Sequence, residues 1–298
     1  MMLFLTAIIW GTAFVAQSVG MDSIGAFTFS GIRVLMGAVA LLPLIYIRDK
    51  MSMRSMDPEQ LVNKRKQDKN SIKYGMILGV VFFAASNFQQ FSLYDALPGK
   101  VAFITALYIF FVPFLELFLG KRASLITWLS VCLGFIGLYF LCIDPRDIMA
   151  IGRGEILAFI CSIGFALHII MIERFTPYVD SVRLSFWQFV TGGLISCVCM
   201  FIFEEPHLDS IVEAIIPLLY TGVMSCGVAY TLQIMGQRYT DSTIASLILC
   251  MESVFGVLAS MLILHETLTV REILGCCVMF LAIVISQVSD RISSMMKR

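Results

Sequence analysis

The chain has little charge for its length. Of its 298 residues, 14% are Asp, Glu, Lys or Arg, whereas 59% are hydrophobic, and the mean hydropathy is +0.89. A soluble domain of this size needs far more polar surface, so the composition excludes an ordinary soluble protein. The alternation of apolar and polar residues typical of a membrane β-barrel is also lacking, so we expect helices to satisfy the backbone in lipid.

Several chemical signatures are missing from the sequence as well. The nine cysteines lie in or at the ends of apolar stretches and form no CxxC pair, so we expect packing residues rather than disulfides or metal ligands. We find no nucleophile motif, metal-ligand cluster or nucleotide-binding P-loop, and we expect no enzyme activity, no metal and no cofactor. The first residues lack a basic region and a cleavage site, so the first stretch is expected to stay in place.

The chain contains ten apolar stretches instead. Most approach or exceed the roughly 20 residues that a tilted helix needs to cross a bilayer. We predict an all-α integral membrane protein with ten transmembrane helices in two five-helix repeats, covering 1–147, with a cytoplasmic loop at 48–71, and 148–298. The ten stretches are 3–19, 24–47, 72–93, 101–119, 125–143, 156–172, 186–203, 211–235, 244–264 and 273–288.

The second five stretches repeat features of the first five in the same order. A shift of 143 residues places Gln90 on Gln233 and Gly79 on Gly222. Because each copy crosses the membrane an odd number of times, the two copies must be inverted relative to one another. Inverted repeats with polar groups near the midplane are typical of secondary transporters.

The distribution of Lys and Arg predicts the orientation. With the N-terminus in the cytoplasm, sixteen of these residues fall in inside loops or the C-terminal tail, and only Lys100, Arg146, Arg153 and Arg271 fall on the other side. Cytoplasmic loops carry an excess of positive charge, so we expect both termini to be cytoplasmic, in the inner membrane of the cell. The basic stretch at 48–71 is interpreted as a solvated loop, with an anionic-lipid patch as the alternative.

Hydrogen-bonding side chains recur at equivalent places on the third and eighth stretches. Asn87 and Gln90 share one helix face, and their counterparts under the 143-residue shift are Tyr230 and Gln233. Hydrocarbon penalises such groups unless they face protein, water or ligand. We interpret both stripes as lining one central cavity; the alternative is that they only join helices.

Two ionisable residues lie deep inside stretches. Arg33 and Glu252 are each about 12 to 14 Å along their predicted helices, near the midplane. An unpaired charge there costs at least about 2.5 to 3.5 kcal/mol, so each is expected to meet a partner, water or solute. Their similar depth allows them to pair with each other, and a permanent structural pair or a neutral Glu252 is the alternative interpretation.

Four further residues complete the candidate site. His168 is the only histidine within a stretch, and an imidazole can relay protons or contact a ligand; a packing role is the alternative. Gln188 is the counterpart of Arg33 under a 155-residue shift, so we expect it to oppose Arg33 across the cavity. Trp10 and Tyr108 offer aromatic faces, although such residues mostly pack between helices.

Several short motifs stand out along the chain. They are WGTAFV at 10–15, Arg33, the stretch 108–113, ESVF at 252–255, His265, Glu266 and Gly275. On these motifs the chain resembles the drug/metabolite transporter superfamily, and within it the ten-helix EamA-type transporters, over essentially its whole length. Two positions depart from the family pattern, since Lys121 replaces a usual acidic residue and Ser253 a frequent proline.

The resemblance implies export or exchange of small organic solutes, such as amino acids and related metabolites, through a central cavity and without ATP hydrolysis. We therefore predict a secondary transporter that works by alternating access, with Arg33 attracting an anionic group and protons as a candidate coupling ion. The expected partners are the solute and the lipid bilayer, not nucleic acid, and the expected assembly is a monomer or homodimer. The alternatives are a facilitator or lipid-carrier flippase, a membrane subunit that transports nothing, and a membrane enzyme that uses His168 and Glu252.

Overall fold

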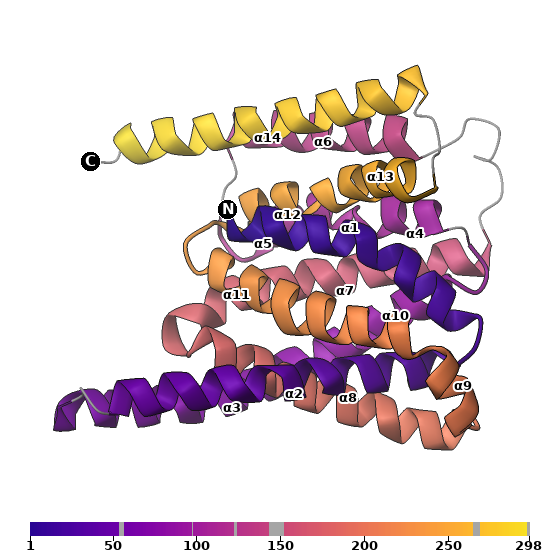
Figure 1. Ribbon diagram of the computed structural model, residues 1–298. Helices are drawn as coiled ribbons and strands as arrows, with labels where there is room; N and C mark the ends of the chain where they lie inside the picture. Colours follow the sequence, from indigo (N-terminus) through magenta and orange to yellow (C-terminus); the bar gives the residue numbers. More distant parts are fainter. Residues whose placement is uncertain (54–56, 97, 122–123, 143–151, 265–268, 297–298) are drawn as a thin grey trace.

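Every regular element of the structure is a helix (Figure 1). The computed structural model describes residues 1–53, 57–96, 98–121, 124–142, 152–264 and 269–296. Seven helical segments in this part of the chain are long and apolar enough to cross a membrane, and two shorter apolar helices cover 125–141 and 242–256. The protein is therefore an all-helical membrane protein.

Six helices make up the described part of the first half of the chain. They are α1 (Met2–Met21), α2 (Ala26–Met53), α3 (Pro58–Ser92), α4 (Pro98–Thr105), α5 (Tyr108–Phe118) and α6 (Leu125–Cys142). The second half begins with α7 (Arg153–Phe175), the 3-10 turn η1 (Thr176–Tyr178) and α8 (Ser181–Phe203). It continues with α9 (Leu208–Glu213), α10 (Ile215–Leu219), the π-helix η2 (Tyr220–Tyr230), α11 (Thr231–Gln237), α12 (Ser242–Leu249), α13 (Met251–Leu264) and α14 (Val270–Met296).

The packing of the helices repeats when the two halves are exchanged. Helix α1 packs on α13, and its counterpart α7 packs on α4 and α5. In the same way α2 packs on η2, whereas α8 packs on α3, and α6 pairs with α14. Helices α1 and α7 begin at opposite ends of the bundle, and α14 ends at the end where α1 begins (Figure 1). The contacts therefore follow a pseudo-twofold relation between two inverted halves.

Glycine allows the closest of these approaches. A Cβ on Gly11 of α1 would lie 2.5 Å from the Glu252 carbonyl oxygen and 2.6 Å from the Gly256 nitrogen, both on α13. A Cβ on Gly137 of α6 would lie 2.8 Å from the Met279 nitrogen of α14. Small residues at such positions let helix backbones meet inside a bilayer.

The outer surface of the bundle is apolar. Leu125, Phe201 and Ile216 are 76%, 74% and 76% exposed, and many other large apolar side chains share this outward position. Exposure on this scale is unfavourable in water, whereas it costs nothing against lipid chains. The surface thus agrees with the apolar composition of the chain.

The expected loop at 48–71 is corrected by the structure. Its described residues belong to two helices and to the Asp57 cap between them, because α2 continues to Met53 and α3 already begins at Pro58. Asp57 and Gln60 form a capping box, in which the Asp57 carboxylate accepts the Gln60 N–H at 2.8 Å and the Gln60 side chain accepts the Asp57 N–H at 3.3 Å. Proline at the first helical position favours the same start.

Ion pairs hold these helical extensions against the start of α8. The Arg183 guanidinium contacts Asp49 of α2 and, at 3.0 Å, Asp68 of α3, and Lys64 lies 2.8 Å from Asp49. The positive charges counted in the sequence are thus partly paired on helices. Neither extension is an unstructured basic loop.

Three of the expected continuous helices are interrupted. The expected helix 101–119 is divided into α4 and α5 at Ala106 and Leu107, and the expected helix 244–264 is divided into α12 and α13 at Cys250. The expected helix 211–235 is built from α9, α10, η2 and α11. The two breaks at Ala106 and Cys250 lie at equivalent positions of the two halves, and they meet in the interior, where the Cys250 Sγ is 3.6 Å from the Ala106 carbonyl oxygen.

Candidate functional site

A narrow cavity lies between the two halves at the level of the interrupted helices. Its volume open to water-sized molecules is about 30 Å³, which is space for little more than a single water. Both halves contribute to its wall, through α1 to α5 and through α7, η2, α11, α12 and α13. The lining residues are Trp10, Ala13, Phe14, Gln17, Arg33, Gln89, Thr105, Tyr108, Phe165, Ile169, Ser225, Tyr230, Gln233, Leu249 and Glu252.

Arg33 brings a positive charge to this cavity. The side chain is only 4% exposed, and its guanidinium carbon lies 5.5 Å from the centre of the Phe29 ring on the same helix. Within the described residues it makes no ion pair, and its buried Nε has no hydrogen-bond partner. A guanidinium presents a planar set of donors that fits a carboxylate or phosphate, and here that set is uncommitted.

Glu252 brings a carboxyl group to the same cavity. It is 4% exposed, and its Oε1 accepts a hydrogen bond from the Tyr108 hydroxyl at 3.3 Å. The pairing with Arg33 that the sequence allowed is absent, since no ion pair joins these two described residues. A basic and an acidic side chain therefore face one cavity without an ion pair between them.

Tyr108 and Glu252 each follow the break in the corresponding helix of their repeat. Tyr108 is the first residue of α5, after the break in the fourth predicted helix, and Glu252 follows the break between α12 and α13. Interrupted helices place polar backbone and side chains at the membrane midplane, where transporters bind their solutes. The hydrogen bond between Tyr108 and Glu252 is thus a contact between the two halves at their shared break.

Aromatic rings form one wall of the cavity. The ring centres of Trp10 and Tyr230 are 4.4 Å apart, and the Trp10 Nε1 donates to the Ser225 carbonyl oxygen at 3.4 Å. Both contacts join α1 to η2, whose wider π-helical turns also carry Ser225 to the cavity. This wall offers an apolar surface beside Arg33 and Glu252.

Amide and hydroxyl groups complete the lining. Gln233 and Gln17 each have a buried side-chain oxygen without a partner among the described residues, and the Gln89 Nε2 lies 3.5 Å from the Thr105 Oγ1. Sequence reasoning missed Gln17, Gln89, Thr105 and Ser225. Gln89 could have been found through its place next to Gln90. Neighbouring residues of a helix point about 100° apart, and of these two only Gln89 faces the cavity.

Six of the ten predicted site residues line the cavity, and the other four lie elsewhere. The Asn87 Nδ2 donates to the Phe83 carbonyl oxygen at 2.9 Å and to the Ser196 Oγ at 3.1 Å, so it joins α3 to α8. Gln90 is completely buried, and neither of its amide atoms has a partner in the described part of the chain. Neither side chain lines the cavity.

His168 and Gln188 contact each other. The His168 Nε2 lies 3.0 Å from the Gln188 Oε1, and the imidazole packs among aromatic rings, including those of Phe82 and Tyr230. Both residues are completely buried. Gln188 therefore does not oppose Arg33 across the cavity, and the pair joins α7 to α8.

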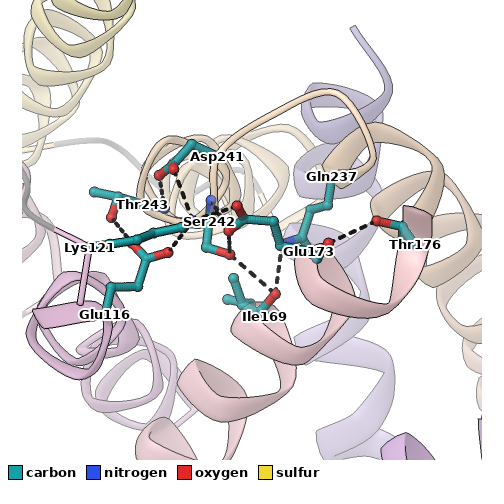
Figure 2. Close-up of polar contacts among 9 residues, drawn as sticks. All are labelled: Glu116, Lys121, Ile169, Glu173, Thr176, Gln237, Asp241, Ser242 and Thr243. Carbon is teal, nitrogen blue, oxygen red and sulfur yellow. Dashed lines mark hydrogen bonds and ion pairs between the residues drawn. The ribbon is translucent and has the colours of Figure 1, made fainter. Parts of the chain in front are cut away.

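A second polar cluster lies at one end of the bundle (Figure 2). Lys121, just after α5, contacts the carboxylates of Glu116 at 2.9 Å, Glu173 of α7, and Asp241 at 3.3 Å. Glu116 thus pairs with the lysine that follows its own helix, and Arg122 lies outside the described residues. Burial lowers the pKa of Lys121, but the hydrogen bonds that its ammonium donates to Glu173 and Glu116 outweigh burial and raise this pKa above its ordinary value.

Known proteins resemble the chain over nearly its whole length. An uncharacterized transporter of Archaeoglobus fulgidus is 28% identical over 95% of this chain and 83% of that protein. The uncharacterized transporter YoaV of Bacillus subtilis is 24% identical over 92% of each chain. One solved crystal structure has the same fold, with a TM-score of 0.78, 14% identity and coverage of 97% and 96% of the two chains.

A family model matches both halves of the chain separately. The EamA-like transporter family model covers residues 1–143 and 152–287. Of the motif residues, His265 and Glu266 lie outside the described part of the structure, and Arg33, Tyr108 and Glu252 line the cavity. Two matching domains agree with the repeated helix packing, and the chain belongs to the EamA-like transporter family as a multi-pass membrane transporter.

Proposed function

We propose that this protein is a secondary transporter that moves small organic solutes, amino acids or related metabolites, by alternating access through the cavity around Arg33 and Glu252. Export from the cytoplasm is the proposed direction, in the inner membrane, with both termini cytoplasmic. The observation that carries the proposal is the presence of an unpaired guanidinium and a carboxyl group in one buried cavity between the halves.

The lining supports a solute with both charged and apolar parts. Arg33 would attract a carboxylate or another anionic group, and Gln233 would donate or accept a hydrogen bond. Trp10, Tyr108 and Tyr230 would pack on the apolar part. The narrow cavity has too little room for an amino acid, so solute binding requires the two halves to move apart.

Proton coupling is part of the proposal, with Glu252 as the group that binds the proton. Its carboxyl group faces the cavity, whereas His168 is buried against Gln188 away from it. A carboxyl group that binds and releases a proton in the cavity where the solute binds links proton movement to solute movement. Uptake into liposomes that does not respond to an imposed pH gradient would contradict this part of the proposal.

Counterflow in proteoliposomes tests the transport function. Liposomes loaded with unlabelled amino acid are diluted into labelled amino acid, and the wild-type protein is expected to accumulate label transiently. Arg33→Ala is expected to lose this accumulation, whereas Arg153→Ala, which removes an arginine that is 77% exposed, is expected to keep it. Wild-type protein that accumulates no water-soluble solute, but moves lipid-linked substrates between leaflets, would favour the flippase alternative.

A further inference from the structure

A lysine bridges three carboxylates where the two halves meet at one end of the cavity. Glu116 and Lys121 belong to the first half, and Glu173 and Asp241 to the second (Figure 2). Accepting oxygens of Glu116, Glu173 and Asp241 all lie within 4.8 Å of one another. Three carboxylates this close repel each other unless a positive charge stands among them, and the Lys121 ammonium supplies that charge.

We propose that Lys121 and these three acidic residues form a latch that closes this end of the cavity and must open during each transport cycle. The inference rests on the transporter function proposed above. It adds a specific gate, held by charge between the halves, to the solute site at the centre of the molecule.

The turn after α5 directs Lys121 into the cluster. Gly120 adopts a left-handed conformation with φ of 83°, its N–H bonds the Leu117 carbonyl at 3.1 Å, and the Lys121 N–H returns to the Glu116 carbonyl at 3.0 Å. This pair of bonds is the Schellman arrangement that ends a helix. It turns the chain back over the end of α5, so the lysine side chain reaches α7 and the start of α12.

Hydrogen bonds extend the latch across the end of the cavity. The Thr243 hydroxyl donates to the Glu116 Oε2 at 2.8 Å, and the Ser242 backbone N–H donates to the Glu173 Oε2 at 3.1 Å. The Ser242 hydroxyl donates to Glu173 and also lies 3.4 Å from the Ile169 carbonyl oxygen. The first turn of α12 is thereby bound to both α5 and α7.

The latch is in direct contact with the cavity wall. Ile169 lines the cavity, and its carbonyl oxygen accepts a hydrogen bond from the Gln237 Nε2 at 3.1 Å and lies 3.4 Å from the Ser242 hydroxyl. A solute that leaves through this end must pass between α5, α7 and the connection from α11 to α12. The pathway at this end therefore opens only when contacts of Lys121 across the halves break.

The charges suit a reversible closure rather than a permanent one. Lys121 is 43% exposed and Asp241 is 41% exposed, whereas Glu116 is 7% exposed. Water and salt reach the outer part of the cluster, so its ion pairs are weak enough to separate. The buried Glu116 keeps its hydrogen bond to Thr243 and marks the inner edge of the latch.

Cysteine accessibility tests the latch without any solute. In a background from which the native cysteines are removed, Ile169→Cys places a thiol in the cavity wall directly beneath the latch. A membrane-impermeant maleimide is applied to vesicles of both orientations, and the labelling rate is measured from each side. From the side of Lys121 the rate is expected to be low in this parent protein.

Removing the charge of Lys121 or of Glu173 is expected to open only the Lys121 side of the cavity. Lys121→Gln or Glu173→Gln should raise labelling from the Lys121 side several-fold, while Lys121→Arg should leave it low. Arg153→Gln serves as the control, because it removes an exposed ion pair between Arg153 and Asp95, near the start of α7, without touching the cluster. If a variant fails to fold, the parent protein in high salt provides the same measurement, and screening should raise the rate from the Lys121 side.

Two results would overturn the latch. One is an unchanged labelling rate in folded Lys121→Gln and Glu173→Gln, and the other is an equal rise from both sides, which indicates general loosening. Either result leaves the proposed transport function intact if counterflow still depends on Arg33. If the wild type shows no counterflow but labelling still depends on the charges of the cluster, the proposed transport function is contradicted and the latch is not.

Discussion

At the scale of single residues, Arg33 and Glu252 carry the functional account. Each is 4% exposed, each faces the same cavity, and neither neutralises the other through an ion pair. A permanent pair would satisfy both charges and leave nothing to attract a solute. Their separate exposure to one cavity agrees with groups that exchange partners during a transport cycle.

Glu252→Gln tests the assignment of the proton-binding group. The amide keeps the size of the side chain and its hydrogen bond with Tyr108, but it cannot bind or release a proton. Solute counterflow is expected to continue. An imposed pH gradient is expected to stimulate transport by the wild type several-fold, and this stimulation should disappear in the variant. His168→Asn is the matched control, since it removes a buried ionisable group that contacts Gln188, and it should retain the response.

Sequence reasoning located part of the site at this scale. Depth along a helix identified Arg33 and Glu252, because an ionisable group at the midplane requires a compensating environment. Polarity alone did not distinguish cavity residues from residues that join helices. Asn87 bonds Ser196, whereas its near neighbour Gln89 faces the cavity, and the difference depends on helix rotation that tertiary packing sets.

At the scale of the elements, the interrupted helices position the site. The breaks at Ala106 and Cys250 bring Tyr108 and Glu252 together from the two halves. Neither break has a proline or glycine at the interruption itself, so hydropathy predicted continuous helices. The extensions of α2 and α3 were also missed, because a polar segment between two apolar stretches looks like a loop unless its cap at Asp57 and its ion pairs are recognised.

Gly11→Ala tests the close contact between α1 and α13. The added Cβ would lie 2.5 Å from a backbone oxygen, and backbone cannot move aside as a flexible side chain does. We expect a loss of about 1 to 3 kcal/mol in unfolding free energy, measured as a lower melting temperature in detergent. Gly227→Ala is the control with a smaller expected loss, since its nearest contact is the Ala40 Cβ at 3.3 Å. Equal melting temperatures for Gly11→Ala and the wild type would contradict this packing.

At the scale of the whole molecule, the two inverted halves explain how the helices pack and where the cavity lies. Equivalent helices make equivalent contacts, and the cavity and the Lys121 cluster both lie where the halves meet. The sequence predicted this organisation well, because ten apolar stretches and the order of matching residues are long-range patterns. The match of one family model to each half agrees with it.

The predicted orientation is testable with fusions to the chain ends. The N-terminal end of α1 and the C-terminal end of α14 lie on the same side of the bundle (Figure 1). The excess of Lys and Arg predicts that this side is cytoplasmic. Fluorescent protein fused to either end is expected to fluoresce, and alkaline phosphatase fused there is expected to be inactive. Active phosphatase at either end would show that the predicted orientation is wrong.

Solute binding in the cavity around Arg33 is measurable as a rise in thermal stability. The purified protein is heated with a panel of amino acids, nucleosides and organic cations, next to Arg33→Ala and Arg153→Ala. A solute at a hundredfold excess over its Kd adds about 2.7 kcal/mol to the folded state, so a bound solute should raise the melting temperature by several degrees. One solute class is expected to stabilise the wild type and Arg153→Ala but not Arg33→Ala. Stabilisation that is the same in Arg33→Ala would contradict the assignment of the cavity as the binding site.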